Sequence, residues 1–427
     1  MLDTPGGSRM YRLRTPVGDR WVDEAAGPAR TGRLAFRCPD SGHHLGGGIE
    51  VLKRIALLMA VLAMVFAACG DDDGGADTTA GGSDTTADGG DGDGITVGIS
   101  WNNYAQPRWA KADGPAIIAA VEAAGGTVIE ADANDSSEQQ LTDVDSLISR
   151  GADALIILAK DSEAILPAVQ RALDANIPVI GYDRLIENTE AFYITFNNVG
   201  VGTIMAEVVT EAVPEGNYAI VKGHSADPNA DFLRGGMQAA LDAHPGITIV
   251  CEDYNDNWDT TNALNMMTAC LAANNNDIQA VISENDSMAT GVVAALDSVG
   301  LAGTVPVTGQ DGDTPALNRV ALGTQLVSVW KDAFGLGATA GAVAVQLAQG
   351  TALEDIKAPS DLAEHVFPEA GVDAQPFTTP GGIDVWSIIL KPTPITLENI
   401  NLVVDLGWET QAAVCAGVSP GTVELCG

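Results

Sequence analysis

Basic residues and long apolar runs are both scarce in this sequence. Of its 427 residues only 21 are Lys or Arg, against 57 Asp or Glu, so the formal net charge at pH 7 is −36. A surface this acidic repels phosphate backbones, which argues against nucleic-acid binding. The apolar run at residues 55–68 has 14 residues, whereas a helix needs about 20 to span a bilayer, so no permanent membrane helix is expected there.

Motifs for cofactors, metals and catalysis are also missing. The first expected strand is followed by Ser100-Trp101-Asn102-Asn103-Tyr104, which has no glycine for a dinucleotide-binding loop. Gly200-Val201-Gly202 lacks the third glycine and the acidic partner of that loop. No HExxH motif and no zinc-type Cys/His spacing occurs, and His224, His244 and His365 are scattered. We therefore expect no enzymatic activity, no cofactor and no metal site.

The segment around the apolar run is typical of an exported protein. Lys53-Arg54 precedes the run, and Cys69 follows it directly after two alanines. This order predicts a secretory signal. It also resembles the lipobox of bacterial lipoproteins, although Phe66 stands where that motif usually has Leu. The resemblance implies lipidation of Cys69 and a place outside the cytoplasm, with membrane contact through the lipid only; the alternative is an ordinary signal with Cys69 as a bystander.

The residues on either side of this signal are not expected to carry function. Residues 1–50 precede the positive charges that should begin a signal, so we interpret them as an extension from a misassigned start, with translation beginning at Val51 and 51–68 as the signal peptide. Residues 69–94 are interpreted as a tether. From residue 70 on they hold eight Asp and no basic or large apolar residue, which predicts a flexible acidic linker.

The remaining 333 residues are enough for two lobes and alternate short β-branched runs with amphipathic helical stretches. This alternation predicts an α/β fold with parallel sheets. The expected strands are Ile95–Ser100, Thr127–Ala131, Ala154–Ala159, Pro178–Tyr182, Tyr218–Lys222, Thr248–Glu252, Ala280–Ser283, Val305–Thr308 and Gln325–Trp330. Expected helices include Pro115–Ala124, Glu138–Ser149, Leu233–Ala243, Asn262–Ala273 and Ala333–Gln349.

Smaller signals refine these elements. Ser136 and Ser162 are expected helix N-caps, and helices should stop at Gly125, Gly151 and Gly350. Beyond Thr351 the alternation weakens, and extended structure is expected at Val385–Leu390 and Ile400–Val404. Four cysteines remain, an even number in an oxidising compartment, and the sequence-local pairs are Cys251 with Cys270 and Cys415 with Cys426.

Polar and aromatic side chains follow most of the expected strands. In parallel sheets ligands bind beyond the carboxyl ends of strands, so these residues should share one site. The segments are Gln106-Pro107-Arg108-Trp109, Tyr182-Asp183-Arg184, His224 to Asn229, Asn257-Trp258, Glu284-Asn285-Asp286, Gly309-Gln310-Asp311 and Lys331-Asp332. Planar amide, carboxylate and guanidinium groups suit sugar hydroxyls, and indole rings suit the C–H faces of a pyranose.

Each of these residues also has a simpler interpretation. Trp109 is as compatible with a core position as with a sugar platform. Asn285 or Asp286 could serve only as the N-cap of the following helix, and Lys331 could be a solvated charge. The argument for a site depends on their joint placement, and on three of the 12 basic residues after residue 94 falling at strand ends.

Longer segments resemble the periplasmic sugar-binding proteins of ABC importers, most closely the D-xylose-binding members, over residues 95 to about 405. The segments that match are Arg108-Trp109 with Lys111, Gly181 to Ile186, Phe192 to Asn198, Pro214 to Tyr218, Asp227 to Ala230, Trp258 with Asn262 to Leu264, Leu271 to Asn276, Asn285-Asp286, Gly309 to Asp311 and Lys331. The departures include Glu284 in place of a small neutral residue and Trp330 in place of Tyr.

The resemblance implies a two-lobed type I binding-protein fold, each lobe a parallel sheet flanked by helices, with three crossovers near Asn198, Trp330 and Val385. Lobe 1 would comprise residues 95–198 and 331–384, and lobe 2 residues 199–330 and 385–427. The sugar contacts that it implies are Arg108, Trp109, Asp183, Arg184, Asn229, Trp258, Asn285, Asp311 and Lys331.

By the same likeness the chain would be a monomer that binds one monosaccharide, with D-xylose the first candidate, and delivers it to a permease. A sugar-sensing subunit for a membrane receptor or kinase is the alternative, because the same lobes would serve both roles. A DNA-binding repressor with these lobes is disfavoured, since no DNA-binding headpiece precedes Ile95 and the charge has the wrong sign.

Overall fold

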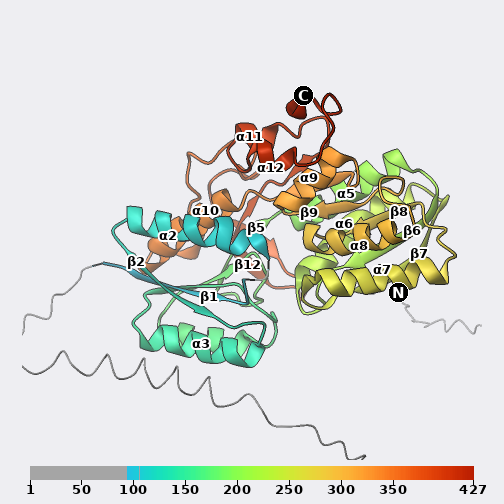
Figure 1. The fold of residues 1–427 in the computed structure, drawn as a ribbon. Coiled ribbons are helices and arrows are strands. Elements are labelled where there is room, and N and C mark those ends of the chain that lie inside the picture. The colour runs from blue at the N-terminus through green and yellow to red at the C-terminus, as the bar shows by residue number, and fades with distance from the viewer. Residues whose placement is uncertain (1–93, 105) are drawn as a thin grey trace, which may run out of the picture. The chain divides into compact units, whose positions relative to one another are not determined.

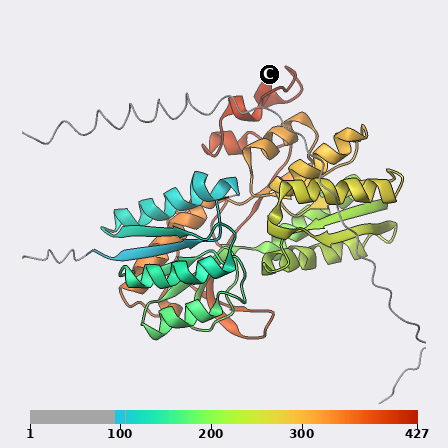
Figure 2. The ribbon, with the colours of Figure 1, turned by 60° about the horizontal axis from the view of Figure 1, so that its bottom comes forward.

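The computed structural model describes residues 94–104 and 106–427. Two lobes lie side by side, each with its own sheets and helices (Figures 1 and 2). The expected extension, the signal peptide, Cys69 and all but the last residue of the tether lie outside the described residues. None of the helices in the described ranges combines the length and apolarity needed to cross a membrane.

Lobe 1 is built on a seven-stranded sheet of order β11-β12-β5-β4-β3-β1-β2, parallel except for the edge strand β11. Helices cover both faces, and β3, β4 and β5 are therefore completely buried, as in other doubly covered parallel sheets. The strands are β1 (Thr96–Trp101), β2 (Thr127–Asp132), β3 (Ala154–Ile157), β4 (Val179–Tyr182), β5 (Phe192–Phe196), β11 (Gln375–Thr378) and β12 (Asp384–Leu390).

Two apolar layers hold the helices of lobe 1 against this sheet. Helices α2 (Gly114–Ala123) and α10 (Ala333–Ala348) share one buried cluster with β1, β5 and β12. On the other face, α3 (Ser137–Ser149) and α4 (Leu166–Asp174) pack on β3. Helices α2 and α10 lie on one side of the sheet and α3 lies on the other (Figure 1).

Lobe 2 has two shorter sheets, ordered β7-β6-β8 and β13-β10-β9, which a parallel bridge between Val281 and Val307 connects. Its strands are β6 (Gly216–Lys222), β7 (Ile247–Tyr254), β8 (Ala280–Ser283), β9 (Thr308–Gln310), β10 (Val327–Trp330) and β13 (Thr393–Ile395). The helices are α5 (Asn198–Ala212), α6 (Pro228–Asp242), α7 (Thr260–Ala273), α8 (Asp286–Ser298) and α9 (Thr314–Leu322). Helices α5 and α6 cross so closely that a Cβ on Gly202 would lie 1.9 Å from the carbonyl oxygen of Leu233.

The chain passes between the lobes three times. The passages lie between β5 and α5, between β10 and α10, and between β12 and β13. The crossover expected near Val385 was placed wrongly, because β12 pairs with β5 in the sheet of lobe 1 and the chain leaves that lobe only after Leu390. The apolar run of β12 belongs to a buried sheet interior, which the sequence pattern does not assign to one lobe or the other.

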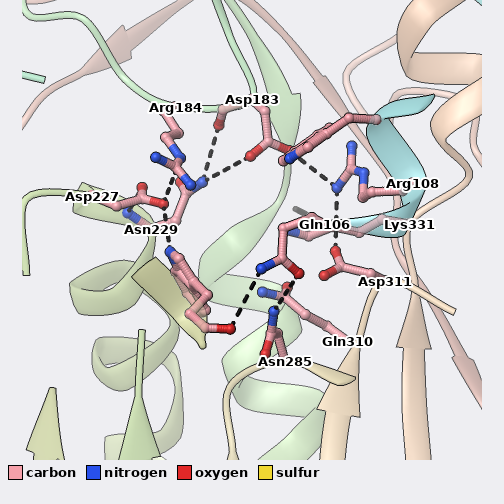
Figure 3. Close-up of a pocket in the computed structure, with 12 residues that line it drawn as sticks. Gln106, Arg108, Asp183, Arg184, Asp227, Asn229, Asn285, Gln310, Asp311 and Lys331 are labelled. Atoms are coloured by element: carbon pink, nitrogen blue, oxygen red, sulfur yellow. Dashed lines mark hydrogen bonds and ion pairs between the residues drawn. The ribbon is translucent and has the colours of Figure 1, made fainter. Parts of the chain in front are cut away.

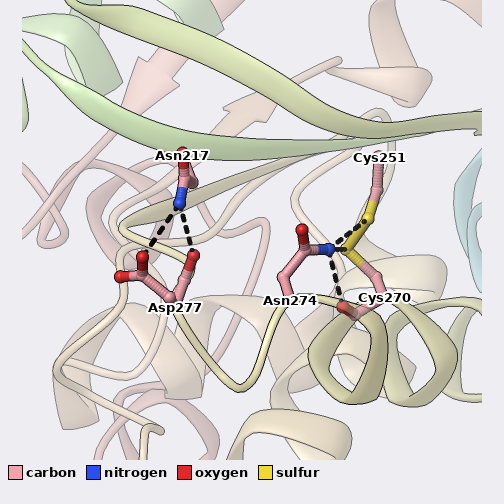
Figure 4. The surroundings of a disulfide bond; sticks show 5 residues. All are labelled: Asn217, Cys251, Cys270, Asn274 and Asp277. Carbon is pink, nitrogen blue, oxygen red and sulfur yellow. Dashed lines mark hydrogen bonds between the residues drawn. A yellow bond between two sulfur atoms is a disulfide. The ribbon is translucent and has the colours of Figure 1, made fainter.

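Two disulfides join the predicted partners. Cys251 in β7 is bonded to Cys270 in α7, and Asn274 donates a hydrogen bond to the carbonyl oxygen of Cys270 at 2.8 Å (Figure 4). Cys415 is bonded to Cys426 near the C-terminus. This last segment contains the short helices α11 (Leu402–Asp405) and α12 (Gln411–Val414), which lie near α9 (Figure 1).

Most expected elements are confirmed to within a few residues, and the exceptions have local causes. The strands β5, β11 and β13 were missed, and β9 begins three residues later than expected because Val305 and Val307 form only isolated bridges. The segment Ile400–Val404 was wrongly expected to be extended: local turns and α11 use its backbone groups instead.

The capping signals gave mixed results. Ser136 accepts a hydrogen bond from the backbone N–H of Gln139 and so caps α3 as predicted. The prediction of Ser162 as an N-cap was wrong, because α4 begins only after Ile165. The Ser162 hydroxyl has no hydrogen-bond partner among the described residues. Gly125, Gly151 and Gly350 all follow helices with positive φ, which confirms them as stops.

Candidate functional site

One pocket lies where the carboxyl ends of strands from both lobes meet (Figure 3). Side chains of both lobes surround it, and most of them are polar or charged. The residues that line it are Gln106, Arg108, Trp109, Asp183, Arg184, Asp227, Asn229, Trp258, Asn285, Gln310, Asp311 and Lys331.

Contacts within lobe 1 hold the side chain of Arg108 in place at the edge of the pocket. It precedes a π-helical turn, Trp109–Asp113, and forms a two-pronged ion pair with Asp113 at 2.9 and 3.1 Å. The hydroxyl of Tyr182 donates a further hydrogen bond to Asp113. The guanidinium carbon lies 4.4 Å from the centre of the Trp109 ring. Arg108 is thus held rigidly, with one nitrogen left to face the cleft.

Asp183 and Arg184 follow β4 in a tight turn. Asp183 has a φ of 61°, a conformation that most residues avoid, and such strain is concentrated at functional sites. Burial would raise the pKa of Asp183, but Arg108, Lys331 and Arg184 outweigh it and lower that pKa, so the carboxylate stays charged. Arg184 donates to the carbonyl oxygen of Ala159 at 2.9 Å.

Lobe 2 supplies its polar groups mainly from helix starts. Asp227 accepts a hydrogen bond from the backbone of Asn229 and caps α6, and Asn285 accepts one from Met288 and caps α8. The simpler interpretation of Asn285 as an N-cap is thus confirmed, and its amide nitrogen also donates to Gln106 at 3.2 Å, while its contact with a sugar stays a prediction. The amide of Asn229 donates to the carbonyl oxygen of Asp183, across the cleft, at 3.1 Å.

Trp258 forms a wall of the pocket from a strained position. Its φ is 55°, and its indole N–H donates to Asp227 at 3.2 Å. The ring lies directly against Gly223, where an added Cβ would be 2.0 Å from the six-membered ring. Gly223 in turn donates its backbone N–H to the buried carboxyl of Glu284 at 2.7 Å. Only a glycine at position 223 leaves room for the indole.

Asp311 is held in place by a buried carboxylate behind the pocket. Asp286 accepts hydrogen bonds from the backbone of Gly312 and Asp313, both at 3.0 Å, and from Ser328 at 2.6 Å. Burial raises the pKa of Asp286 to about 7. These bonds fix the turn in which Asp311 has a φ of 99°.

The charges in the pocket balance. Arg108, Arg184 and Lys331 stand against the carboxylates of Asp183, Asp227 and Asp311. Two ion pairs of the pocket cross between the lobes: Arg108 with Asp311 at 3.2 Å, and Arg184 with Asp227 at 2.8 Å. Lys331 is only 2% exposed, so its interpretation as a solvated charge was wrong, and burial lowers its pKa against the opposing effect of Asp183 and Asp311. A balanced pocket suits an uncharged polar ligand.

Several buried polar atoms of the pocket remain without a hydrogen-bond partner in the described part of the chain. They include the indole nitrogen of Trp109, one carboxylate oxygen of Asp183, the Nε of Arg184 and the amide oxygen of Gln310. Two of them do lie in ion pairs, Asp183 with Arg108 and Arg184 with Asp227. Because buried polar groups are nearly always satisfied, these atoms can accept or donate to ligand hydroxyls.

All nine residues expected at the site line this one pocket. Gln106, Asp227 and Gln310 were not named, yet each lies in a strand-end segment that the sequence had marked. Trp109 packs in the core of lobe 1, as its simpler interpretation has it, and also lines the pocket; its role as a sugar platform stays a prediction. The structure thus defines a two-lobed protein with one enclosed polar site between its sheets.

Comparisons with known proteins agree with this class. The model of the periplasmic binding protein domain matches residues 97–352, and the chain therefore belongs to that family. A D-xylose-binding periplasmic protein of Escherichia coli (strain K12) is 35% identical over 260 residues, which cover 60% of this chain and 78% of the relative. A protein of the same name from Haemophilus influenzae is 30% identical over 325 residues, covering 75% and 92%.

A solved structure shows the same fold with a different sugar. The ABC transporter solute-binding protein of Clostridium phytofermentans, with bound β-D-glucose, has a TM-score of 0.63 and 26% identity, and covers 75% of this chain and 99% of its own. A second, from Actinobacillus succinogenes with bound D-allose, has a TM-score of 0.60 and 25% identity over 72% and 99%. The relatives are binding proteins of transport systems rather than enzymes.

Proposed function

We propose that this chain is the substrate-binding lipoprotein of an ABC sugar importer, and that it binds one uncharged monosaccharide, D-xylose first among the candidates. The observation that carries the proposal is the enclosed pocket, in which three cations balance three carboxylates between Trp109 and Trp258. Hydroxyls are recognised by such fixed donors and acceptors, and indole faces by the C–H faces of a sugar ring. The relatives named for D-xylose support this choice of sugar.

Binding would couple to closure of the lobes. A sugar held by Asp183 of lobe 1 and Asp311 of lobe 2 stabilises the closed form because it contacts both lobes only there. The permease would recognise that closed form and receive the sugar. Lipid on Cys69 would keep the monomer at the outer face of the membrane, and a Cys69→Ala variant should leave the membrane fraction for the soluble one.

The first experiment is a thermal-shift screen of the wild-type protein. A ligand that binds only the native state raises the melting temperature according to its affinity. We expect D-xylose to give a shift, and D-glucose, D-allose and xylitol to rank its specificity. D-glucuronate and D-glucose 6-phosphate are charged controls that the balanced pocket should reject. No shift with any neutral monosaccharide would contradict the proposal.

Calorimetry with variants then tests the site. Asp311→Ala and Trp258→Ala should each reduce sugar affinity about a hundredfold, because one leaves Arg108 without its partner across the cleft and the other removes a wall of the pocket. Asp145→Ala, at an exposed ion pair with Arg171, is the control. Unchanged affinity in both pocket variants would disprove the site assignment.

A further inference from the structure

The turn that carries Trp258 is held firmly at its ends by lobe 2. Asn255 donates its backbone N–H to Lys222 at 3.0 Å, and its amide group exchanges two hydrogen bonds with the backbone of Asp259, at 2.8 and 3.0 Å. Between them Asn257 and Trp258 both have positive φ, 63° and 55°. Consecutive left-handed residues other than glycine persist only where their surroundings impose them.

The middle of this turn is contacted by lobe 1. Lys160, which lies three residues beyond β3, donates a hydrogen bond from Nζ to the side-chain oxygen of Asn257. The same Nζ lies 3.5 Å from Nε2 of His224 in lobe 2. Gln106 of lobe 1 donates to the carbonyl oxygen of Trp258 at 3.4 Å. Both strained residues are therefore contacted directly from the opposite lobe.

Lys160 is itself anchored in lobe 1. Its backbone N–H donates to Gln140 at 2.8 Å, and Gln140 donates in turn to the carbonyl oxygen of Leu158 at 2.9 Å. Asp135, also in lobe 1, lies 3.6 Å from Nζ. The side chain is 9% exposed although it does not line the pocket. A buried ammonium group is costly unless it is paired, and Lys160 has partners on both sides, Asp135 in lobe 1 and Asn257 in lobe 2.

We propose that Lys160 is a positioning residue for Trp258: on closure its ammonium group holds Asn257, and so keeps the turn in the conformation that places the indole against the ligand. This inference rests on the proposed function, because it assigns the indole to the binding of the same sugar. Trp258 would then be fully in place only in the closed form, so Lys160 should affect the rate of sugar release far more than the rate of its capture.

The test uses full-length protein labelled with 5-fluorotryptophan, in which the Trp258 resonance is assigned through Trp258→Phe. Lys160→Met should shift or broaden that resonance, weaken D-xylose binding about tenfold and raise the dissociation rate by a similar factor. Lys111→Met is the matched control. That lysine also reaches across, to Glu409 at 2.9 Å and Thr314 at 3.5 Å, but lies away from the turn. It should leave the Trp258 resonance unchanged.

A second pair of variants separates positioning from general loss of stability. Lys160→Arg keeps the charge and a donor and should restore most of the affinity, whereas Asn257→Ala should weaken binding as much as Lys160→Met does. The double variant should be no weaker than either single one, because both remove the same contact. Additive losses, or the same resonance and release rate as in Lys111→Met, would overturn the proposal.

The outcomes also separate this inference from the proposed function. If the wild-type protein binds no monosaccharide, the proposed function fails. The positioning role then fails with it, because Lys160 is proposed to hold the Trp258 turn only in the sugar-bound, closed form. If the wild type binds sugar and the variant binds equally well, only the positioning role fails.

Discussion

The two lobes build their halves of the pocket in different ways. In lobe 1, Arg108 is already compensated within the lobe by Asp113 and Asp183, whereas Arg184 has its ion-pair partner in lobe 2. Lobe 2 supplies carboxylates whose ion pairs, within the described residues, are made with lobe 1: Asp311 with Arg108, and Asp227 with Arg184. The arginine at the centre of the pocket is therefore held by lobe 1 alone, whereas the carboxylates of lobe 2 depend on lobe 1 for their partners.

This difference indicates what drives the lobes together. Where the lobes meet, Asp227 and Asp311 gain cationic partners from lobe 1, and these ion pairs offset the cost of removing the two carboxylates from water. The binding of the sugar then needs to supply only the rest of the free energy that favours the closed form. Four predictions test the contrast between an arginine that lobe 1 holds by itself and a dependent lobe 2.

The largest effect is expected from Arg108→Met, because it removes the cation that both halves share. Asp113 and Asp183 would remain buried without their arginine, and the free energy of unfolding should fall by about 3–5 kcal/mol. Urea unfolding measures this loss. Arg171→Met removes an exposed pair and should cost less than about 1 kcal/mol. Equal losses in the two variants would contradict the hold of lobe 1 on Arg108.

The next largest loss of stability is expected when the disulfide between β7 and α7 of lobe 2 is removed. Replacing Cys251 and Cys270 by serine opens a loop with a sequence separation of 19 residues, which should cost about 3 kcal/mol. Hydrogen exchange should accelerate in β7 and α7 before it does in β1 or α3. Uniform acceleration in both lobes would show that their stabilities are not separate.

Asp311→Asn removes a charge from the dependent half and should act on binding rather than on folding. Sugar affinity should fall about thirtyfold to a hundredfold, while the free energy of unfolding changes by less than about 1 kcal/mol, because Arg108 keeps its partners in lobe 1. Calorimetry and urea unfolding of the same variant measure the two quantities. A large fall in the free energy of unfolding would show that lobe 1 depends on the ion pair between Arg108 and Asp311 as much as lobe 2 does, and would contradict the contrast between the lobes.

The smallest effect concerns pH. Burial, with Lys160 and Arg184 nearby, lowers the pKa of His224 below its usual 6.5, although Asp227 and Asp256 oppose the shift. Protonation is thus easier in an open or unfolded chain, so the closed form is stable above about pH 6.5 and loses stability as pH falls below it. Sugar affinity should drop about twofold to fivefold from pH 7 to 5.5. His224→Asn should abolish the drop, and His244→Asn should retain it.

Much of the fold and the site could be predicted because both leave local signals. β-branched runs, helix stops at Gly125, Gly151 and Gly350, and polar residues after strands were all visible along the chain. The predictions failed where tertiary packing decides the outcome. The apolar pattern of β12 would suit a sheet in either lobe, and Ser162 precedes a helix that starts only after Ile165. Gln106, Asp227 and Gln310 were seen as polar strand-end residues but could not be singled out, because only geometry distinguishes a lining side chain from its neighbours.

By itself the sequence determined the α/β class, the acidic composition and the set of segments from which a site could be made, whereas the pairing of the four cysteines came from the structure. The class and the segments follow from short-range patterns of burial, turn chemistry and charge. Only the tertiary structure decided which groups meet: Arg108 with Asp311 across 203 positions, and Gln106 with Trp258 across 152. Such pairs depend on how the separately packed cores of the two lobes face each other, and no local pattern in the chain specifies which residues of the two lobes will meet.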